Sequence, residues 1–245
     1  MRTVGGVDEL EVSGKCASLR TLLARQLPTP QHNQFRTGLN SLDAILPHGG
    51  LRCGAIHELL FDSKNSSPKS LAMLLARAAQ AATGGVIVWS DPKRELYSIA
   101  LLSAGIDLRR LILLRPRNAA EEISALTECL RCKGVSATVT SLNRLTDIQA
   151  RRLQLAAENG GGVGICLRPM LRGSGSNYAA ATRWLVRPAL ENENSQNWNA
   201  ELLHGHGGRV GSSVLLEVDR ETGNVRASAP VAHRPVAPTP IRATA

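Results

Sequence analysis

A lysine and a serine stand side by side where a polar loop gives way to a helical pattern, at Lys69-Ser70. An ammonium group and a hydroxyl at a helix start suit phosphate, because the helix N-terminus adds free N–H groups and a positive dipole. The phosphate-loop pattern is G-x-x-x-x-G-K-[ST], and Ser63 to Ser70 lie on it with Ser63 and Pro68 in place of both glycines. Since Pro68 has no N–H and a fixed φ, we expect a degenerate, non-functional phosphate loop; the alternative is an ordinary helix start capped by Ser67.

A second group of residues could contact an anion. Arginines lie in or beside the glycine-rich stretch from Arg172 to Asn177, and they are Arg168, Arg172, Arg183 and Arg187. Guanidinium groups around such a loop suit contacts to DNA phosphates. The alternative is a solvated loop with scattered charge. Aromatic residues make up 3% of the chain, so a platform for stacking bases is not expected.

Metal ligands and activated nucleophiles are poorly represented. Cys129-x-x-Cys132 falls in a helical pattern without a second pair of cysteines, and His204 and His206 form an isolated histidine-rich spot. The Gly-Ser-Gly-Ser run at 173–176 lacks the register of the G-x-S-x-G nucleophile turn. We therefore expect no metal site, no cofactor and no hydrolase triad.

The elements that must position these residues alternate along the chain. Apolar runs at Ala55–Leu60, Val86–Ser90, Leu111–Leu114, Val135–Ser141, Val163–Leu167 and Thr182–Val186 predict strands. Helical patterns cover Pro68–Ala82, Arg94–Ala104, Ala119–Arg131 and Thr146–Asn159. This alternation predicts an α/β fold with a mostly parallel sheet flanked by helices. Residues 191–199 are amide-rich and predict a loop, and Val214–Val218 with Val225–Ala227 predict a C-terminal β-hairpin.

Both ends of the chain differ from this core, which we place at residues 35–228. Residues 1–34 form an N-terminal arm and linker, because a stripe of leucines at helical spacing is followed by two prolines. The stripe, a candidate partner-binding face, is Leu19, Leu22, Leu23 and Leu27. The alternative is that the stripe packs on the chain's own core. Residues 229–245 are basic and rich in proline, and we expect a disordered tail that orders on a partner.

Composition limits the class of protein. The chain of 245 residues is 43% hydrophobic, enough to bury a core without disulfide or metal support. A formal net charge of +9 favours an anionic partner such as nucleic acid. No apolar stretch approaches the ~20 residues of a membrane span, and the first residues lack a signal sequence. We expect a cytoplasmic protein whose five cysteines are reduced.

The segment from Phe35 to Leu59 resembles the opening of the RecA-like ATPase core, which reads roughly T-G-x-x-x-L-D-x-x-L-G-G-G-L-x-x-G-x-(I/L)-x-E. The matching residues are Thr37, Gly38, Leu42, Asp43, Gly49, Gly50, Leu51, Gly54, Ile56 and Glu58. Gly105-Ile106-Asp107 before Leu111 looks like the G-V-D-x-x-x-L segment of the same core. The resemblance covers about residues 36 to 190 and implies the RecA-like fold.

Within this superfamily the chain is most similar to the ImuA family, RecA-like accessory proteins of the bacterial SOS mutagenesis cassette. The residues that carry this likeness are the runs Trp89–Tyr97, Arg151–Glu158 and Leu167-Arg168-Pro169. The resemblance implies a role in DNA damage-induced translesion synthesis. It implies an ImuB-like Y-family pseudo-polymerase as partner, with RecA, an error-prone replicative-type polymerase, DNA or a second copy as further partners.

The chain departs from the RecA-like pattern where hydrolysis needs acids. The strand Val135–Ser141 ends in Thr140 and Ser141, where an active enzyme holds Mg²⁺ with an aspartate. Asp91 and Glu95 fall in the region of the catalytic carboxylate, although Asp91-Pro92 is also a simple turn and helix start. We therefore expect a non-catalytic scaffold. Two alternatives remain open: a SulA-like inhibitor of cell division that binds FtsZ, and an active RecA-type ATPase.

Overall fold

A computed structural model describes residues 34–62, 68–170, 179–189, 195–221, 224–228 and 231–232. The chain divides into two compact units, Met1–Asn33 and Gln34–Ala245, and the described residues all belong to the second. The predicted leucine arm lies outside the described residues. So does the predicted tail, apart from residues 231–232.

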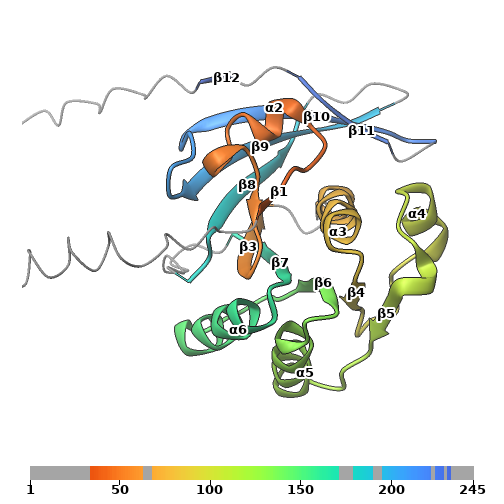
Figure 1. The fold of residues 1–245 in the computed structure, drawn as a ribbon. Helices are drawn as coiled ribbons and strands as arrows, with labels where there is room; N and C mark the ends of the chain where they lie inside the picture. The colour runs from red at the N-terminus through yellow and green to blue at the C-terminus, as the bar shows by residue number, and fades with distance from the viewer. Residues whose placement is uncertain are drawn as a thin grey trace, which may run out of the picture. The chain divides into compact units, whose positions relative to one another are not determined.

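The second unit is built on one large sheet with strand order β11-β10-β9-β8-β3-β7-β6-β4-β5 (Figure 1). The strands are β3 (Ala55–Phe61), β4 (Val86–Ser90), β5 (Leu111–Leu114), β6 (Val135–Ser141), β7 (Val163–Pro169), β8 (Thr182–Pro188), β9 (Ser195–Gly205), β10 (Ser212–Asp219) and β11 (Val225–Ala227). Pairing is parallel from β8 across β3 to β5 and antiparallel from β8 to β11. A separate pair joins β1 (Gln34–Phe35) and β2 (Leu51–Arg52). The α/β prediction with its mostly parallel sheet and closing hairpin is confirmed.

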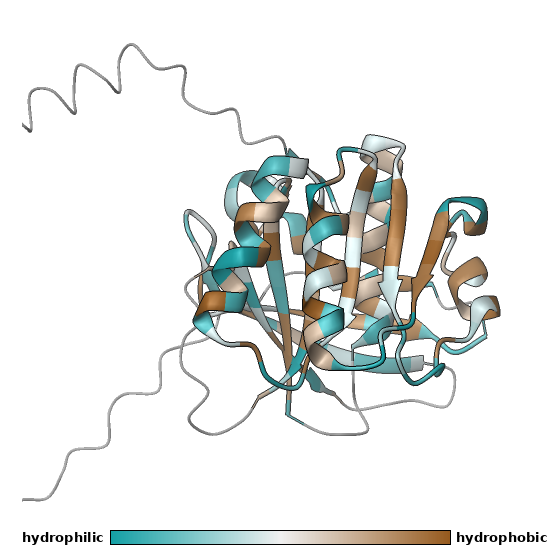
Figure 2. Cartoon of the chain, turned by 90° about the horizontal axis from the view of Figure 1, so that it is seen from below, coloured by the Kyte–Doolittle hydropathy of each residue, from teal (hydrophilic) through white to brown (hydrophobic). Residues whose placement is uncertain are grey.

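Helices cover both faces of the parallel part. The elements are α2 (Asn40–Asp43), α3 (Lys69–Thr83), α4 (Ser98–Ser103), α5 (Ala119–Arg131) and α6 (Asp147–Gly160), with 3-10 turns η1 (Pro47–Gly49) and η2 (Leu108–Arg110). Alternation along β3 separates two apolar cores, since Leu59 packs in the cluster with α3 and Ile56 packs in the cluster with α5 and α6. Figure 2 shows the result as apolar strands lying among helices whose polar residues face outward.

The local signals explain most boundaries. All residues of β3 are buried, as a central parallel strand requires. Helix α3 ends at Gly84, which takes the left-handed φ of 71° that favours glycine. Its start was predicted at Pro68 with a Ser67 cap, whereas the helix begins at Lys69 and Pro68 occupies the cap position without a side-chain hydrogen bond.

Two predicted elements are wrong. The predicted helix Arg94–Ala104 is helical over Ser98–Ser103, because residues 91–97 form a turn in which Arg94 has a φ of 58°. The predicted loop 191–199 contains the first part of β9. The asparagine and glutamine side chains of this segment obscured the alternation typical of a strand, in which Trp198, Ala200 and Leu202 are buried.

The short strand β12 (Val231–Ala232) pairs with β10 at Ser212 and Ser213. Residues 233–245 lie outside the described part of the chain, so disorder of that segment stays a prediction.

Candidate functional site

A small cleft, called here the strand-end cleft, opens at the carboxyl ends of β4 and β6 beside the start of α3. Its volume is about 110 Å³. The polar residues that line it include Lys69, Asp91, Lys93, Glu95, Ser141 and Asn143. This is the place where open α/β sheets bind ligands, because strand ends and helix N-termini meet there. The structure therefore brings Lys69 together with the two carboxylates singled out from the sequence.

Lys69 meets a carboxylate of its own chain in this cleft. Its Nζ lies 3.5 Å from Glu95 Oε2, and both side chains are partly exposed. The ammonium that would meet a phosphate is thus held beside a negative charge. Such an exposed pair stabilises the fold by less than about 1 kcal/mol. Its main effect is that the carboxylate partly neutralises the positive charge of Lys69 in the cleft.

Asp91 is used by the turn that carries Glu95. The side chain is buried, and it accepts hydrogen bonds from the backbone N–H groups of Glu95 at 2.9 Å and Leu96 at 3.3 Å. This is the simple turn role that the Asp91-Pro92 pair indicated. Both carboxylate oxygens of Asp91 therefore accept hydrogen bonds from the backbone of this turn.

The end of β6 presents Ser141, and not Thr140, to the cleft. Thr140 points to the opposite face of the sheet, where its hydroxyl donates to Glu122 Oε1 at 2.7 Å. Ser90 donates to the same oxygen at 2.5 Å. Of the two hydroxyl residues at the end of this strand, Ser141 is therefore the one that lines the cleft.

Glu122 was not found from the sequence. It is a buried carboxylate on α5, and its partners Ser90 and Thr140 come from two different strands. A glutamate in the first turn of a helix is ordinarily exposed and favourable for the dipole, so nothing in the pattern marked it. Its two hydroxyl donors tie α5 to the ends of β4 and β6.

The predicted anion-binding arginines have different environments. Arg168 and Arg183 reach Glu58, which is fully buried in β3, with N···O distances of 2.7 Å and 2.9 Å. Their charge is therefore neutralised in part inside the fold. Arg187 is 45% exposed and lies 3.5 Å from both Asp62 and Glu201. Arg172, like Ser63, lies outside the described residues.

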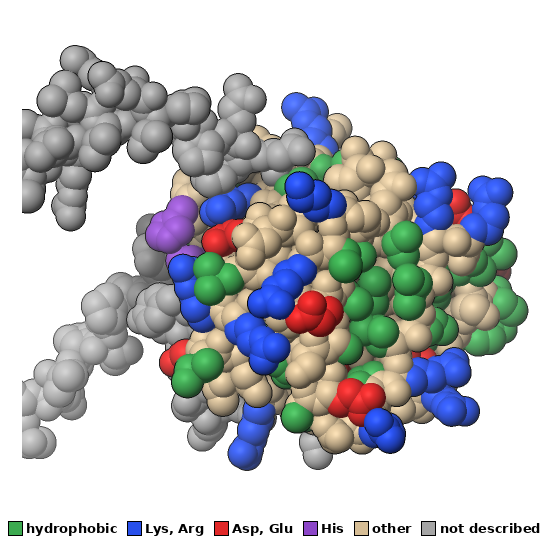
Figure 3. All heavy atoms as spheres, turned by 60° about the horizontal axis from the view of Figure 1, so that its bottom comes forward, with side chains coloured by type: hydrophobic (Ala, Val, Ile, Leu, Met, Phe, Trp, Pro, Cys, Tyr) green, Lys and Arg blue, Asp and Glu red, His purple; other side chains and the backbone are tan. Residues whose placement is uncertain are grey.

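Basic side chains do not form a single stripe on the face shown in Figure 3. Lysines and arginines there are spread among neutral surface and separate acidic residues (Figure 3). On this face, charge alone does not outline a track for a nucleic-acid backbone.

The segment from Phe35 to Leu59, which resembles the opening of the RecA-like core, has a structural role. Asp43 Oδ1 accepts hydrogen bonds from the N–H of Thr37 at 2.9 Å and from its hydroxyl at 2.8 Å. A Cβ at Gly50 would lie 2.7 Å from the carbonyl oxygen of Phe35, so a side chain does not fit there. Gln154, within the run Arg151–Glu158, accepts from the N–H of Ile56 and donates to the carbonyl of Gly54.

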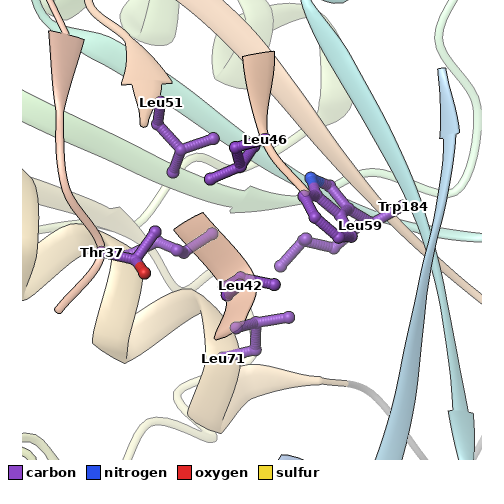
Figure 4. Close-up of a pocket in the computed structure, with 8 residues that line it drawn as sticks. Thr37, Leu42, Leu46, Leu51, Leu59, Leu71 and Trp184 are labelled. Atoms are coloured by element: carbon purple, nitrogen blue, oxygen red, sulfur yellow. The ribbon is translucent and has the colours of Figure 1, made fainter. Parts of the chain in front are cut away.

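A second hollow lies between α2, α3 and β8 (Figure 4). Apolar side chains converge on it, among them Leu42, Leu59, Leu71 and Trp184, and Thr37 supplies one hydroxyl. We interpret it as part of the core, because its lining lacks convergent polar groups that would orient a ligand.

Burial shifts the pKa of two side chains in the core, His57 and Cys166, toward their uncharged forms. Burial lowers the pKa of His57 to about 4, and its ring nitrogens bond Thr182 and the carbonyl of Arg52. Burial, followed by the charge of Glu58, raises the pKa of Cys166 to about 12, so this thiol is a poor nucleophile. The described residues hold no cluster of three His, Cys, Asp or Glu side chains suited to a metal. None of the helices that the structure describes has the length and apolarity to cross a membrane.

Comparison with known proteins identifies relatives of this chain. Two ImuA proteins of Caulobacter vibrioides, from strains NA1000 (CB15N) and CB 15 (ATCC 19089), are each 33% identical to it over 207 residues. The match covers 77% of this chain and 84% of the relative. A crystal structure of the RadB recombinase has a TM-score of 0.62 and 14% identity, and the match covers 78% of this chain and 98% of RadB. No family model matches the sequence. The likeness to RadB establishes a RecA-like fold, and by its identity to the two relatives the chain belongs to the ImuA family.

Proposed function

We propose that this protein is a non-catalytic RecA-like scaffold of SOS-induced translesion DNA synthesis in the cytoplasm. It binds an ImuB-like Y-family pseudo-polymerase, and RecA, an error-prone replicative-type polymerase and DNA are its further candidate partners. Membership of the ImuA family supports the pathway, since function is argued from sites and relatives and not from a fold.

The observation that carries the non-catalytic part is the pairing of Lys69 with Glu95 in the strand-end cleft. A phosphoryl-transfer site concentrates positive charge and Mg²⁺ ligands around the phosphates. Here the lysine faces a carboxylate, the β6 position that faces the cleft is Ser141, and Pro68 lacks the N–H that a phosphate loop donates. These features oppose nucleotide binding.

The two alternatives differ in what supports them. An active RecA-type ATPase requires the strand-end cleft to bind a triphosphate despite the negative charge of Glu95. A SulA-like inhibitor requires a surface for FtsZ, and the 84% coverage of an ImuA relative at 33% identity favours the accessory role over it.

Contacts to DNA remain part of the proposal through Arg172 and Arg187. Arg187 keeps 45% of its side chain exposed, although two carboxylates lie near it. Arg168 and Arg183 instead pair with the buried Glu58 inside the sheet.

The test uses the full chain at its own chromosomal locus with an affinity tag. After DNA damage, the protein should copurify with the ImuB-like protein, and its deletion should lower damage-induced mutagenesis to the level of a strain without that partner. Normal mutagenesis in the deletion strain would refute the accessory role. Filamentation of cells on overexpression, with FtsZ copurifying, would support the SulA-like alternative.

A further inference from the structure

The two ends of the large sheet are finished differently. At one end, the edge is made of two short strands, β11 and β12, of three and two residues, which both pair with β10. At the other end, β5 pairs with β4 and with no other strand of the described residues. Strand β5 therefore leaves one edge of the sheet open.

Among the described residues, no strand pairs with the outward-facing backbone groups of this open edge. The carbonyl of Leu114 accepts from the N–H of Asp91 at 2.8 Å, so Leu114 points its backbone toward β4. In a parallel pair, alternate residues turn their backbone groups to the two sides of the strand. The N–H and C=O of Leu113 hence point away from β4, toward the position of an added strand.

The side chains at this edge are apolar and exposed. Strand β5 is Leu-Ile-Leu-Leu, with 50% of Ile112 and 37% of Leu113 exposed. Helix α4 lies near β5 in Figure 1. Tyr97, just before this helix, is 63% exposed, and Leu102 within it is 60% exposed. Native edge strands are ordinarily protected by short length, lysine, proline or a bulge. Strand β5 is short, at four residues, but it has no lysine, proline or bulge.

Basic residues outnumber acidic ones on both sides of β5. Arg109, Arg110, Arg115 and Arg117 flank the strand, whereas the acids that pair with them are Asp107 and Glu121. Pairing two β5 edges would bring these arginines of two copies together. The excess of positive charge disfavours a second copy and favours a strand with acidic flanks.

We propose that the open edge of β5, with the apolar side chains of α4, binds an extended segment of another protein that has alternating apolar residues and acidic flanks. The segment adds a strand to the sheet, so that backbone groups such as those of Leu113 supply affinity and the arginines select the flanks. This extends the partner binding proposed above by naming the surface and the chemistry of the segment.

The test titrates the full-length protein into two fluorescein-labelled peptides and follows fluorescence anisotropy. Both peptides alternate valine and threonine; one is flanked by aspartate and glutamate and the other by lysine and arginine. The acid-flanked peptide should bind about tenfold more tightly, and the difference should shrink at high salt. Leu113→Pro should abolish binding, since it removes an outward N–H and keeps the pairing with β4. Ile148→Lys is the matched control, because it removes an exposed apolar side chain on α6 and should bind as the wild type does.

The double variant Arg109→Glu with Arg115→Glu changes exposed side chains, so it tests the idea even if the proline variant fails to fold. It should reverse the preference between the peptides. Equal binding of both peptides by the wild type, or full binding by a folded Leu113→Pro protein, would overturn the proposal. A dimer of the wild type that Leu113→Pro converts to monomer would assign the edge to a second copy instead. Because the titration uses defined peptides, its result stands whether or not the cellular role in mutagenesis is upheld.

Discussion

Arg168 Nη1 donates to Glu58 Oε1 at 2.7 Å, across the boundary between two neighbouring strands of the sheet. Arg183, from the strand on the other side, donates to the second oxygen of the same carboxylate at 2.9 Å. One fully buried anion thus holds two cations, and the three strands β7, β3 and β8 share one charge cluster.

Replacing Glu58 with glutamine should destabilise the fold by roughly 3 kcal/mol or more, because two guanidinium groups would lose their buried counterion. Urea unfolding followed by circular dichroism measures the change. Asp62→Asn is the control, since it breaks a half-exposed pair with Arg187 and should cost less than about 1 kcal/mol. A Glu58→Gln protein as stable as the control would mean that the cluster contributes nothing.

His57 should make the fold sensitive to acid. Its pKa lies near 6.5 when unfolded and about 4 when folded, so the unfolded chain takes up a proton first as the pH falls. The contribution of neutral His57 is complete above pH 6.5 and is lost as the pH falls through about 4, with a total of ~3 kcal/mol. Unfolding free energies measured across this range should fall less steeply for His57→Gln than for the wild type. An equal slope for His57→Gln and the wild type would contradict the assignment.

ATP with Mg²⁺ should show no binding in the micromolar range by calorimetric titration. Loss of two or more charge-assisted hydrogen bonds, each about 1.5–3 kcal/mol, weakens phosphate binding by roughly 10²- to 10⁴-fold. Lys69→Ala should leave damage-induced mutagenesis unchanged. Micromolar affinity for ATP that disappears in Lys69→Ala would restore the ATPase alternative.

The leucine stripe of the N-terminal arm should dock on a partner or a neighbouring subunit. Introducing Leu22→Asp and Leu23→Asp together places two charges on the stripe and should weaken complex formation, while thermal unfolding of the core stays unchanged. Size-exclusion chromatography with the copurified partner measures the complex. If every complex persists in a folded double variant, the stripe has another role.

Deleting residues 233–245 should leave the melting temperature almost unchanged and weaken a partner complex. The deletion starts beyond β12, so the pairing of Val231–Ala232 with β10 is kept. A basic, proline-rich segment that orders on binding contributes to the complex and not to the isolated fold. A lower melting temperature with normal partner binding would contradict this role.

The pattern of continuous apolar runs predicted the parallel core because its central strands are buried on both faces. Strands β4, β5 and β6 and helix α5 have the predicted bounds. It failed at β9, where one face is solvated and asparagines alternate with Trp198 and Ala200. The ion pairs of Glu58 join residues 110 and 125 positions apart, which no local pattern reveals. Similarly, a helix start next to Lys69 was visible, but its neutralisation by Glu95 depends on how the turn after β4 folds back.

The two edges of the sheet offer different lengths of backbone to an added strand. In the described part of the chain, one edge consists of the short strands β11 and β12, of three and two residues, and the other edge is β5, of four residues. The strand addition proposed at β5 therefore predicts one bound segment per molecule, because the strands at the other edge are shorter. A partner with two such segments would join two copies of the protein and no more.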